Sequence, residues 1–353
     1  MVGHGSMSEP TPYRALGEPL LAALEALSTA PHGSWWRDVL ADPDLLLAVR
    51  NRSLNVYYRG ASLFRITSAG EGVAAETHVK YLLRQRQAHA RIGQDGSFGS
   101  APAEAVWNRY EGPATLAEMK RAAIPLAGME KTGLHVLVQA SRNVVDVEIA
   151  LAGAPVADAA AEPDGAEIEA AQLTYETTAT ARPRQDRLDA ASLEERGVAG
   201  EAWLVFHEAK LATNPALRSK TTPAIVEQMR RYRATLKQEA ERLADSYPAL
   251  CRDLVKLGAL RRGAGAACGL NAADLPQRDP LVDEVASGAR ILRVDPEPRL
   301  VVFGFDADAR DSTVRPITQE LSVTHGLRVY AVGRPARGTA AFRRPSDLPY
   351  DAI

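Results

Sequence analysis

The stretch AWLVFHEAK, residues 202–210, decides the fold, because it is an apolar strand that carries two charged side chains near its end. A run of apolar and aromatic residues bounded by turn residues is typical of a strand. The stretch RLDAASL, residues 187–193, also predicts a strand, and residues 194–200 between the two predict a turn. We therefore expect an antiparallel hairpin over this part of the chain.

Three charged residues of this hairpin suggest its chemistry. Side chains alternate along a strand, so Glu208 and Lys210 face the same side of the sheet, and Asp189 lies on the partner strand. Charged groups among apolar neighbours are costly unless they are paired or bound to metal. Two carboxylates can hold Mg²⁺, the ion activates a water molecule, and a lysine can stabilise charge on a phosphate. The arrangement suits metal-assisted cleavage of a phosphodiester.

A helix expected over residues 223–247 adds a further motif. Gln228 and Tyr232 are four positions apart and share a helix face. Asp189, then the triplet EAK at residues 208–210, then QMRRY at residues 228–232 resemble the D…ExK…QxxxY pattern of the PD-(D/E)XK nuclease superfamily, and of its RecB-like branch in particular. The resemblance covers roughly residues 122–335.

The resemblance implies a fold and a set of roles. The fold would be α/β, with a restriction-endonuclease-like central mixed sheet flanked by helices, to which this chain adds an N-terminal α+β extension. Asp189 and Glu208 would bind Mg²⁺ or Mn²⁺, Lys210 would be the catalytic lysine, and Gln228 and Tyr232 would support the site. The implied activity is metal-dependent hydrolysis of DNA, in repair, restriction or defence.

One part of the family pattern is incomplete in this chain. The family carries a further acid on the helix before the hairpin, but no GxxxE precedes the strand. Glu130 is the candidate for that acid, and a solvated helix residue is the alternative. Asp146 and Glu148, on an expected strand over residues 143–151, are a second option for an extra ligand.

Two alternatives to the nuclease activity stay open. The first is a catalytically inactive nuclease-like domain that binds nucleic acid or a protein partner. The second is a structural or interaction protein in which Glu208 and Lys210 form only a mutual surface ion pair, which contributes about 0–1 kcal/mol.

Other candidate residues favour structural roles. His207 precedes Glu208, points to the opposite face by alternation, and is expected to be packed. Asp306 and Asp308 resemble the DxD motif of haloacid-dehalogenase phosphatases, but the chain that follows is too short for that domain, so helix capping is the better interpretation. Tyr57 and Tyr58 could stack on bases, and packing within their hairpin is the alternative.

The overall charge of the chain is nearly balanced. It has 42 Lys and Arg against 44 Asp and Glu, a formal net charge of -2. This average combines an acidic stretch around residues 152–180 with a basic zone around residues 182–237. A solvated basic helix face would explain the zone without a ligand. Contact with a nucleic-acid backbone is the functional interpretation, through Arg218, Lys220, Arg230 and Arg231.

Composition excludes several classes of protein. With 46% hydrophobic and 24% charged residues, the chain is too apolar for a disordered protein. Cys251 and Cys268 cannot build a disulfide framework or a four-ligand zinc site, and free thiols in a reducing cytoplasm are expected. No apolar run approaches the roughly 20 residues of a membrane span. We expect a cytoplasmic protein without membrane contact, with DNA as partner and a homodimer as one option.

The chain divides into four expected parts. Residues 1–12 read as a tag, 13–120 as an accessory α+β module, 121–340 as the nuclease-like domain, and 341–353 as a tail. Residues 152–183, rich in Ala, Pro, Asp and Thr, predict a loose insertion.

The remaining elements follow from periodicity and turn residues. The last three form an expected βαβ unit with parallel strands. In chain order we expect helical structure over 13–49, a hairpin of strands 53–58 and 62–66, loop with short helical pieces over 90–116, a helix over 122–140, and then strand 299–305, helix 310–324 and strand 327–332.

Overall fold

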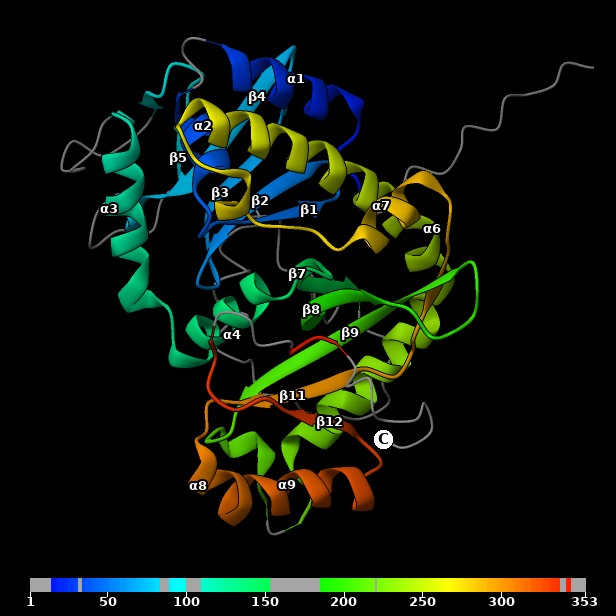
Figure 1. The fold of residues 1–353 in the computed structure, drawn as a ribbon. Coiled ribbons are helices and arrows are strands. Elements are labelled where there is room, and N and C mark those ends of the chain that lie inside the picture. Colours follow the sequence, from blue (N-terminus) through cyan, green and yellow to red (C-terminus); the bar gives the residue numbers. More distant parts are fainter. Residues whose placement is uncertain are drawn as a thin grey trace, which may run out of the picture.

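The computed structural model describes residues 14–30, 34–82, 89–99, 109–152, 185–219, 221–336 and 341–343. These residues form two sheets flanked by helices, and Figure 1 shows the sheets one above the other. The expected mixed α/β class is therefore confirmed. Residues 153–183 of the predicted insertion lie outside the described residues, as do residues 1–13 and most of the predicted tail, and residue 152 ends a strand.

The first sheet is an antiparallel meander in which each strand pairs with the next along the chain. Two-residue turns join β1 to β2, β2 to β3 and β3 to β4, so these strands pair in sequence order. The expected hairpin is confirmed as β2 and β3, which pair across the turn at Arg59 and Gly60. The strands are β1 (Leu46–Arg50), β2 (Ser53–Tyr58), β3 (Ala61–Ala69), β4 (Gly72–His78), β5 (His89–Ile92) and β6 (Phe98–Gly99).

The second sheet, called the central sheet below, is mixed and has the order β12-β11-β9-β8-β7, with β10 also paired to β9. The expected hairpin of β8 and β9 is confirmed as antiparallel, and β11 and β12 run parallel, as the predicted βαβ unit requires. The strands are β7 (Val144–Ala152), β8 (Gln185–Glu194), β9 (Glu201–Leu211), β10 (Ile291–Val294), β11 (Arg299–Phe303) and β12 (Arg328–Ala331).

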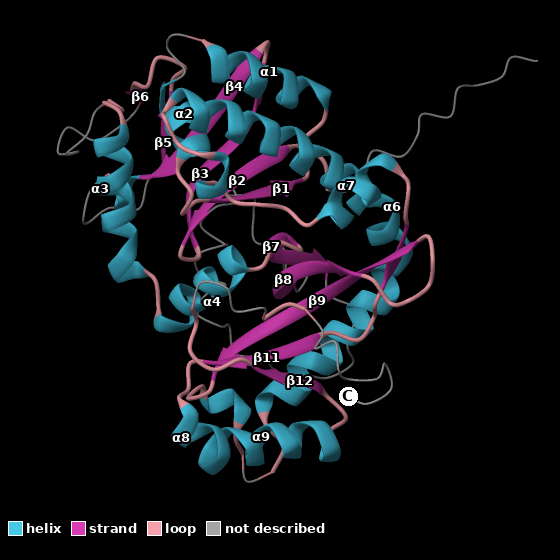
Figure 2. Cartoon of the chain, viewed as in Figure 1, coloured by secondary structure: helices cyan, strands magenta, loops and turns pink. Residues whose placement is uncertain are grey.

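Helices cover both sheets, as Figure 2 shows. The segment 307–324, which joins β11 to β12, is helical throughout, with two π-helical turns, Arg310–Val314 and Glu320–Thr324. Four short 3₁₀ turns are Val79–Tyr81, Ile124–Leu126, Pro215–Leu217 and Ala272–Asp274. The α-helices are α1 (Glu18–Thr29), α2 (Ser34–Ala41), α3 (Pro113–Ala123), α4 (Met129–Ala140), α6 (Ala224–Ala267), α7 (Pro280–Ser287), α8 (Ala307–Ala309) and α9 (Arg315–Gln319).

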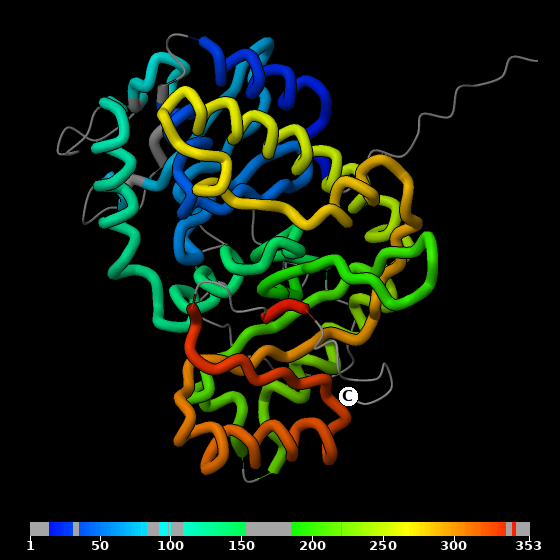
Figure 3. Tube along the Cα trace, viewed as in Figure 1, coloured from blue at the N-terminus to red at the C-terminus, as the bar shows by residue number. Residues whose placement is uncertain are grey.

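Helix α6 connects the two halves of the molecule. It has 44 residues, so it is about 66 Å long. Its first half packs against the central sheet and its second half against α2 and β1, and Figure 3 follows its path from one sheet to the other. The prediction of a helix over 223–247 is therefore right in place but wrong in length, because Pro248 lies inside the helix instead of ending it.

Three other predicted segments differ from the structure. Residues 46–50 are a strand and not a helix, because a short apolar run fits either element and pairing with β2 decides. The predicted helix over 122–140 is interrupted, since the chain turns in a 3₁₀ helix around Pro125, and α4 begins only at Met129. The stretch 90–116, predicted as loop with short helical pieces, contains the start of α3, as predicted, but also part of β5 and all of β6.

A shared hydrophobic core joins the two sheets. One cluster of buried side chains runs from α1 and the first sheet, for example Leu24 and Phe64, to the central sheet and α6, for example Phe206 and Tyr247. A second cluster lies between α4 and the opposite face of the central sheet and includes Phe342. Cys251 is buried, Cys268 is exposed, and both are free thiols as expected. None of the helices that the structure describes is long and apolar enough to span a bilayer.

Candidate active site

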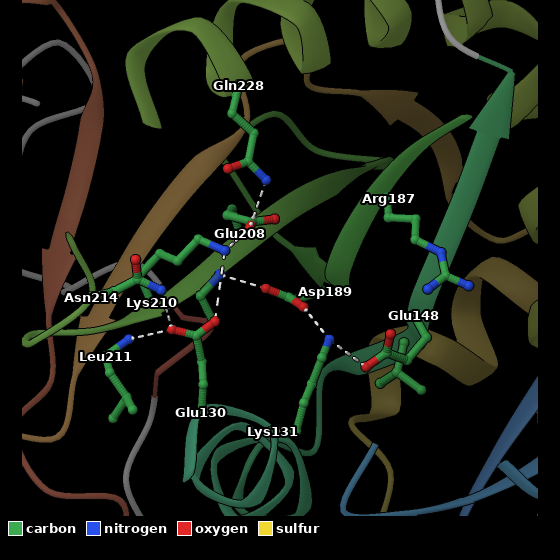
Figure 4. A network of polar contacts seen from close by, with 12 residues as sticks. Glu130, Lys131, Glu148, Arg187, Asp189, Glu208, Lys210, Leu211, Asn214 and Gln228 are labelled. Carbon is green, nitrogen blue, oxygen red and sulfur yellow. Dashed lines mark hydrogen bonds and ion pairs between the residues drawn. The ribbon is translucent and has the colours of Figure 1, made fainter. Parts of the chain in front are cut away.

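The β8–β9 hairpin presents Glu208 and Lys210 on one face of the central sheet, as strand alternation predicts. Lys210 Nζ lies 2.7 Å from Glu208 Oε1 (Figure 4). The register that pairs Ala190 with His207 places Asp189 across from Glu208 at the next step. The Glu208 and Lys210 side chains are only 4% and 10% exposed. The three predicted residues therefore meet where water is largely excluded. The alternative in which Glu208 and Lys210 form an ion pair on the surface is wrong.

Helix α4 brings Glu130 to the site from the end of the sheet. Its Oε2 accepts hydrogen bonds from Leu211 N at 3.0 Å and Asn214 Nδ2 at 2.8 Å. Its Oε1 lies 3.7 Å from Lys210 Nζ. Glu130 was predicted either as an acid of the site or as a solvated helix residue, and these contacts favour the first role. Asn214 is a further residue of this cluster, which no motif indicated.

Lys131, the next residue of α4, is the main site residue that the sequence did not indicate. Its Nζ lies 2.8 Å from Glu148 Oε1 and 3.0 Å from Asp189 Oδ1. Glu148, the second option for an extra acid, thus joins the site. The Glu148 backbone is left-handed, with φ of 50°, which costs about 1 kcal/mol for a residue with a side chain. Such strain is often found at functional positions.

The charges of the cluster perturb the pKa values of its members. Burial opposes ionisation of Asp189, but the charges of Lys131 and Lys210 and a hydrogen bond from Ala209 N lower its pKa overall. Burial and the charge of Asp189 raise the pKa of Glu208 to about 8, although Lys210 favours the ionised form. Burial opposes the charge of Lys210, but Glu208 and Asp189 outweigh it and raise the lysine pKa.

Helix α6 closes the site from the opposite side to α4, as Figure 4 shows for Gln228. Gln228 Nε2 donates to Glu208 Oε1 at 2.9 Å and to the Tyr232 hydroxyl at 2.7 Å, so the two residues share a face as predicted. The Tyr232 hydroxyl donates to the Arg187 carbonyl. Burial and the charge of Glu208 raise the pKa of Tyr232 well above its usual value, so it acts as a neutral donor.

The predicted basic residues lie around the site in different ways. Arg218 donates to the Ala212 carbonyl at 2.5 Å, in the loop that follows β9. Arg231 Nε lies 3.6 Å from Asp186, and Arg230 is paired with Glu227 on the surface of α6. Lys220 lies outside the described residues. Of these four residues, Arg218 is the closest to Glu208 in the sequence.

Some candidates lie elsewhere. Asp146, offered with Glu148 as an extra ligand, is wrong in that role, because its buried carboxylate pairs with Arg14 and Arg50 on the side of the first sheet. Glu148, two positions further along β7, has a positive φ and faces Lys131 of α4 instead.

The structural interpretations of three other groups are confirmed. His207 is buried against Phe342. Asp306 caps α8 by accepting a hydrogen bond from Ala309 N. Tyr57 and Tyr58 are both buried, so packing is their role rather than stacking on bases.

The cluster suits a divalent cation by its charge. Contacts join four carboxylates, from Glu130, Glu148, Asp189 and Glu208, to two ammonium groups. Arg187, two positions before Asp189 on β8, lies at the border of the cluster (Figure 4) and reduces the excess of negative charge. Burial, and after it the charge of Asp189, favour the protonated form of Glu208 in this cluster. Hard carboxylate oxygens are the ligands that Mg²⁺ and Mn²⁺ prefer.

The carboxylates are paired with lysines in this structure. Among the described residues, no group of three His, Cys, Asp or Glu side chains is arranged as a ready-made metal site. A bound ion would therefore compete with Lys131 and Lys210 for the oxygens of Asp189 and Glu208.

Comparisons with known proteins add no relative. No protein-family model matches the chain, and no similar chain was found among curated proteins or among solved structures.

Proposed function

We propose that this protein is a metal-dependent nuclease that hydrolyses phosphodiester bonds, most simply those of DNA. Asp189 and Glu208 would hold Mg²⁺ or Mn²⁺, with Lys210 beside them and Glu130, Gln228 and Tyr232 in support. The observation that carries the proposal is a buried cluster in which a carboxylate with a pKa of about 8 lies opposite a second carboxylate and 2.7 Å from a lysine. Such perturbed groups gather at catalytic sites.

Each residue has a role that follows from its contacts. The ion, when bound, supplies an activated water molecule and neutralises phosphate charge. The water oxygen would form a bond to phosphorus and release a proton, while the bond from phosphorus to the leaving oxygen breaks and that oxygen takes up a proton. Lys210 places positive charge beside the phosphate oxygens. Gln228 holds Glu208 through its amide, and Glu130 fixes the end of β9 on which Lys210 lies.

The proposal is tested by cleavage of single- and double-stranded DNA in Mg²⁺ and Mn²⁺. We expect Asp189→Asn, Glu208→Gln and Lys210→Met each to lower the rate by at least about 100-fold, the scale of a lost metal ligand or charge donor. Calorimetry should show Mn²⁺ binding to the wild-type chain and weaker binding to Glu208→Gln.

Matched controls come from exposed residues of the same types. Glu227→Gln and Lys256→Met each remove one partner of a surface ion pair and should leave cleavage unchanged. The proposed enzymatic activity would be refuted if Glu208→Gln cleaved DNA at the wild-type rate and the wild-type chain bound no Mn²⁺.

A second function is favoured by one observation. Lys131 and Lys210 already neutralise two of the carboxylate groups, which suits a catalytically inactive domain that binds nucleic acid or a protein. In that case the wild-type chain would bind DNA in the absence of divalent ions and never cleave it. Arg218→Gln would then weaken DNA binding, while Glu208→Gln would leave it unchanged.

A further inference from the structure

Lys131 is held in its position by the first sheet as well as by the carboxylates. The β2–β3 turn reaches the stem of Lys131, and a Cβ placed on Gly60 would lie 3.0 Å from Lys131 Cβ and 3.1 Å from its Cγ. Gly60 has φ of 80°, which glycine adopts without strain. A glycine at this turn therefore allows the first sheet to press against the lysine.

Two further contacts fix the same region. Arg59 N donates to His135 Nδ1 at 3.2 Å, which ties the turn to α4 one helical turn beyond Lys131. Arg50 Nη2 donates to the carbonyls of Val147 and Glu148, at 2.5 and 3.3 Å. The first sheet thus holds both the lysine and the strained residue that accepts its charge.

A recess lies beside this lysine. It is small, opens to solvent, and is lined by Lys131, Glu148 and Asp189 together with Tyr57 and Gly60. The Lys131 side chain is 30% exposed, whereas those of Glu148 and Asp189 are 12% exposed. Two carboxylates next to open space commonly bind a metal ion. Here the ammonium group of Lys131 occupies that position between them.

We propose that the Lys131 ammonium is an internal cation of the site. It fills, between Glu148 and Asp189, the position that a second divalent ion would otherwise take, so that the site holds a single divalent ion, on the side of Glu208. This inference rests on the proposed function for that ion and adds to it the number of ions and the part that the first sheet plays. Lys131 is a positioning residue, because it acts through Asp189.

The test is a Mn²⁺ titration of the full chain by calorimetry, which counts bound ions without measuring cleavage. We expect one ion per chain in the wild type and two in Lys131→Met, since Glu148 and Asp189 Oδ1 are then both open to an ion. Lys131→Arg should keep the count at one, because the charge is restored. Lys120→Met is the matched control: Lys120 also bridges two carboxylates, Asp42 and Asp44, but Asp44 is 42% exposed and the pair lies outside the site, so its loss should leave one ion.

A second pair of variants keeps the lysine and moves it. Gly60→Ala should push the stem of Lys131 aside and admit a second ion, bound more weakly than in Lys131→Met. Gly70→Ala is its control, because Gly70 also has a positive φ, 57°, but nothing lies within 4 Å of the added Cβ. Circular dichroism checks that each variant is folded.

The outcomes separate the two proposals. A count of two in the wild type, or of one in both Lys131→Met and Gly60→Ala, would overturn the role of Lys131 and leave the nuclease proposal intact. A count of zero in the wild type would overturn the metal site itself.

Discussion

Glu208 is a residue at which the site departs strongly from ordinary solution chemistry. Its pKa is raised to about 8 by burial and by the charge of Asp189. Between about pH 4.5 and 8 the folded chain therefore binds a proton that the unfolded chain releases. The contribution of Glu208 to the free energy of unfolding is lost as pH rises through this window, by at most about 1.4 kcal/mol per pH unit.

The predicted slope is isolated by comparing two chains. His135, whose pKa is lowered by burial to about 4, contributes the opposite slope below about pH 6.5. Urea unfolding of metal-free wild type and Glu208→Gln from pH 6.5 to 8 should therefore show a falling free energy in the wild type and a flatter curve in the variant. Parallel curves for the two chains would mean that Glu208 is ionised throughout.

At the scale of elements, α4 approaches the central sheet closely because of Gly133. An added Cβ there would lie 2.5 Å from Phe303 Cε2 and 3.2 Å from Pro335 Cγ. Gly133→Ala should lower the free energy of unfolding by about 1–3 kcal/mol, although alanine is the better helix former. It should also weaken binding of the ion beside Glu208, because Glu130, which fixes the end of β9, moves with the helix.

Gly263→Ala in α6 is the matched substitution. No atom lies within 4 Å of its added Cβ, so helix propensity alone should act and stabilise the chain by up to about 1 kcal/mol. Both free energies come from urea unfolding. If the two substitutions changed the free energy of unfolding equally, α4 would be able to shift without loss of stability.

The sequence predicts those features of the site that depend on residues close together in the chain. Glu208 and Lys210 share a face because strand alternation is local, and Gln228 and Tyr232 do so because helix geometry is local. The approach of Lys131 to Asp189 depends on how α4 crosses the sheet, which no local pattern encodes. The break before α4 could have been read from Pro125, since a proline removes a helix hydrogen bond.

The same limit applies to the fold. The strands of the central hairpin and the βαβ order were predictable, because apolar runs and turn residues mark them. The packing of α6 on both sheets was not, since it depends on contacts such as those of Arg261, whose Nη2 donates to the Leu45 carbonyl at 2.7 Å. Whether the central sheet belongs to the restriction-endonuclease-like class stays a prediction.

At the scale of the whole molecule, a buried ion cluster joins the two sheets. The side chain of Asp146 on β7 has no exposed surface, and it pairs with Arg14 and Arg50 at 3.3 and 2.6 Å. The Tyr247 hydroxyl of α6 donates to it at 3.1 Å. Asp146→Asn should lower the free energy of unfolding by about 3–5 kcal/mol, because buried arginines lose their partner.

The measurement is urea unfolding followed by circular dichroism and by tryptophan fluorescence. Because the core is shared, both signals should change in one transition, in the wild type and in the variant. Asp311→Asn, which breaks an exposed pair with Arg315, should have little effect. Two separate transitions would show that the sheets unfold independently.

The length of α6 has a consequence for how this protein can change in evolution. The helix holds Glu208 through Gln228 near its start and the first sheet through Arg261 near its end. Each residue inserted between them would turn the far end by about 100° and advance it by about 1.5 Å. We therefore expect homologues to vary in their loops but to keep the number of residues between these two contacts.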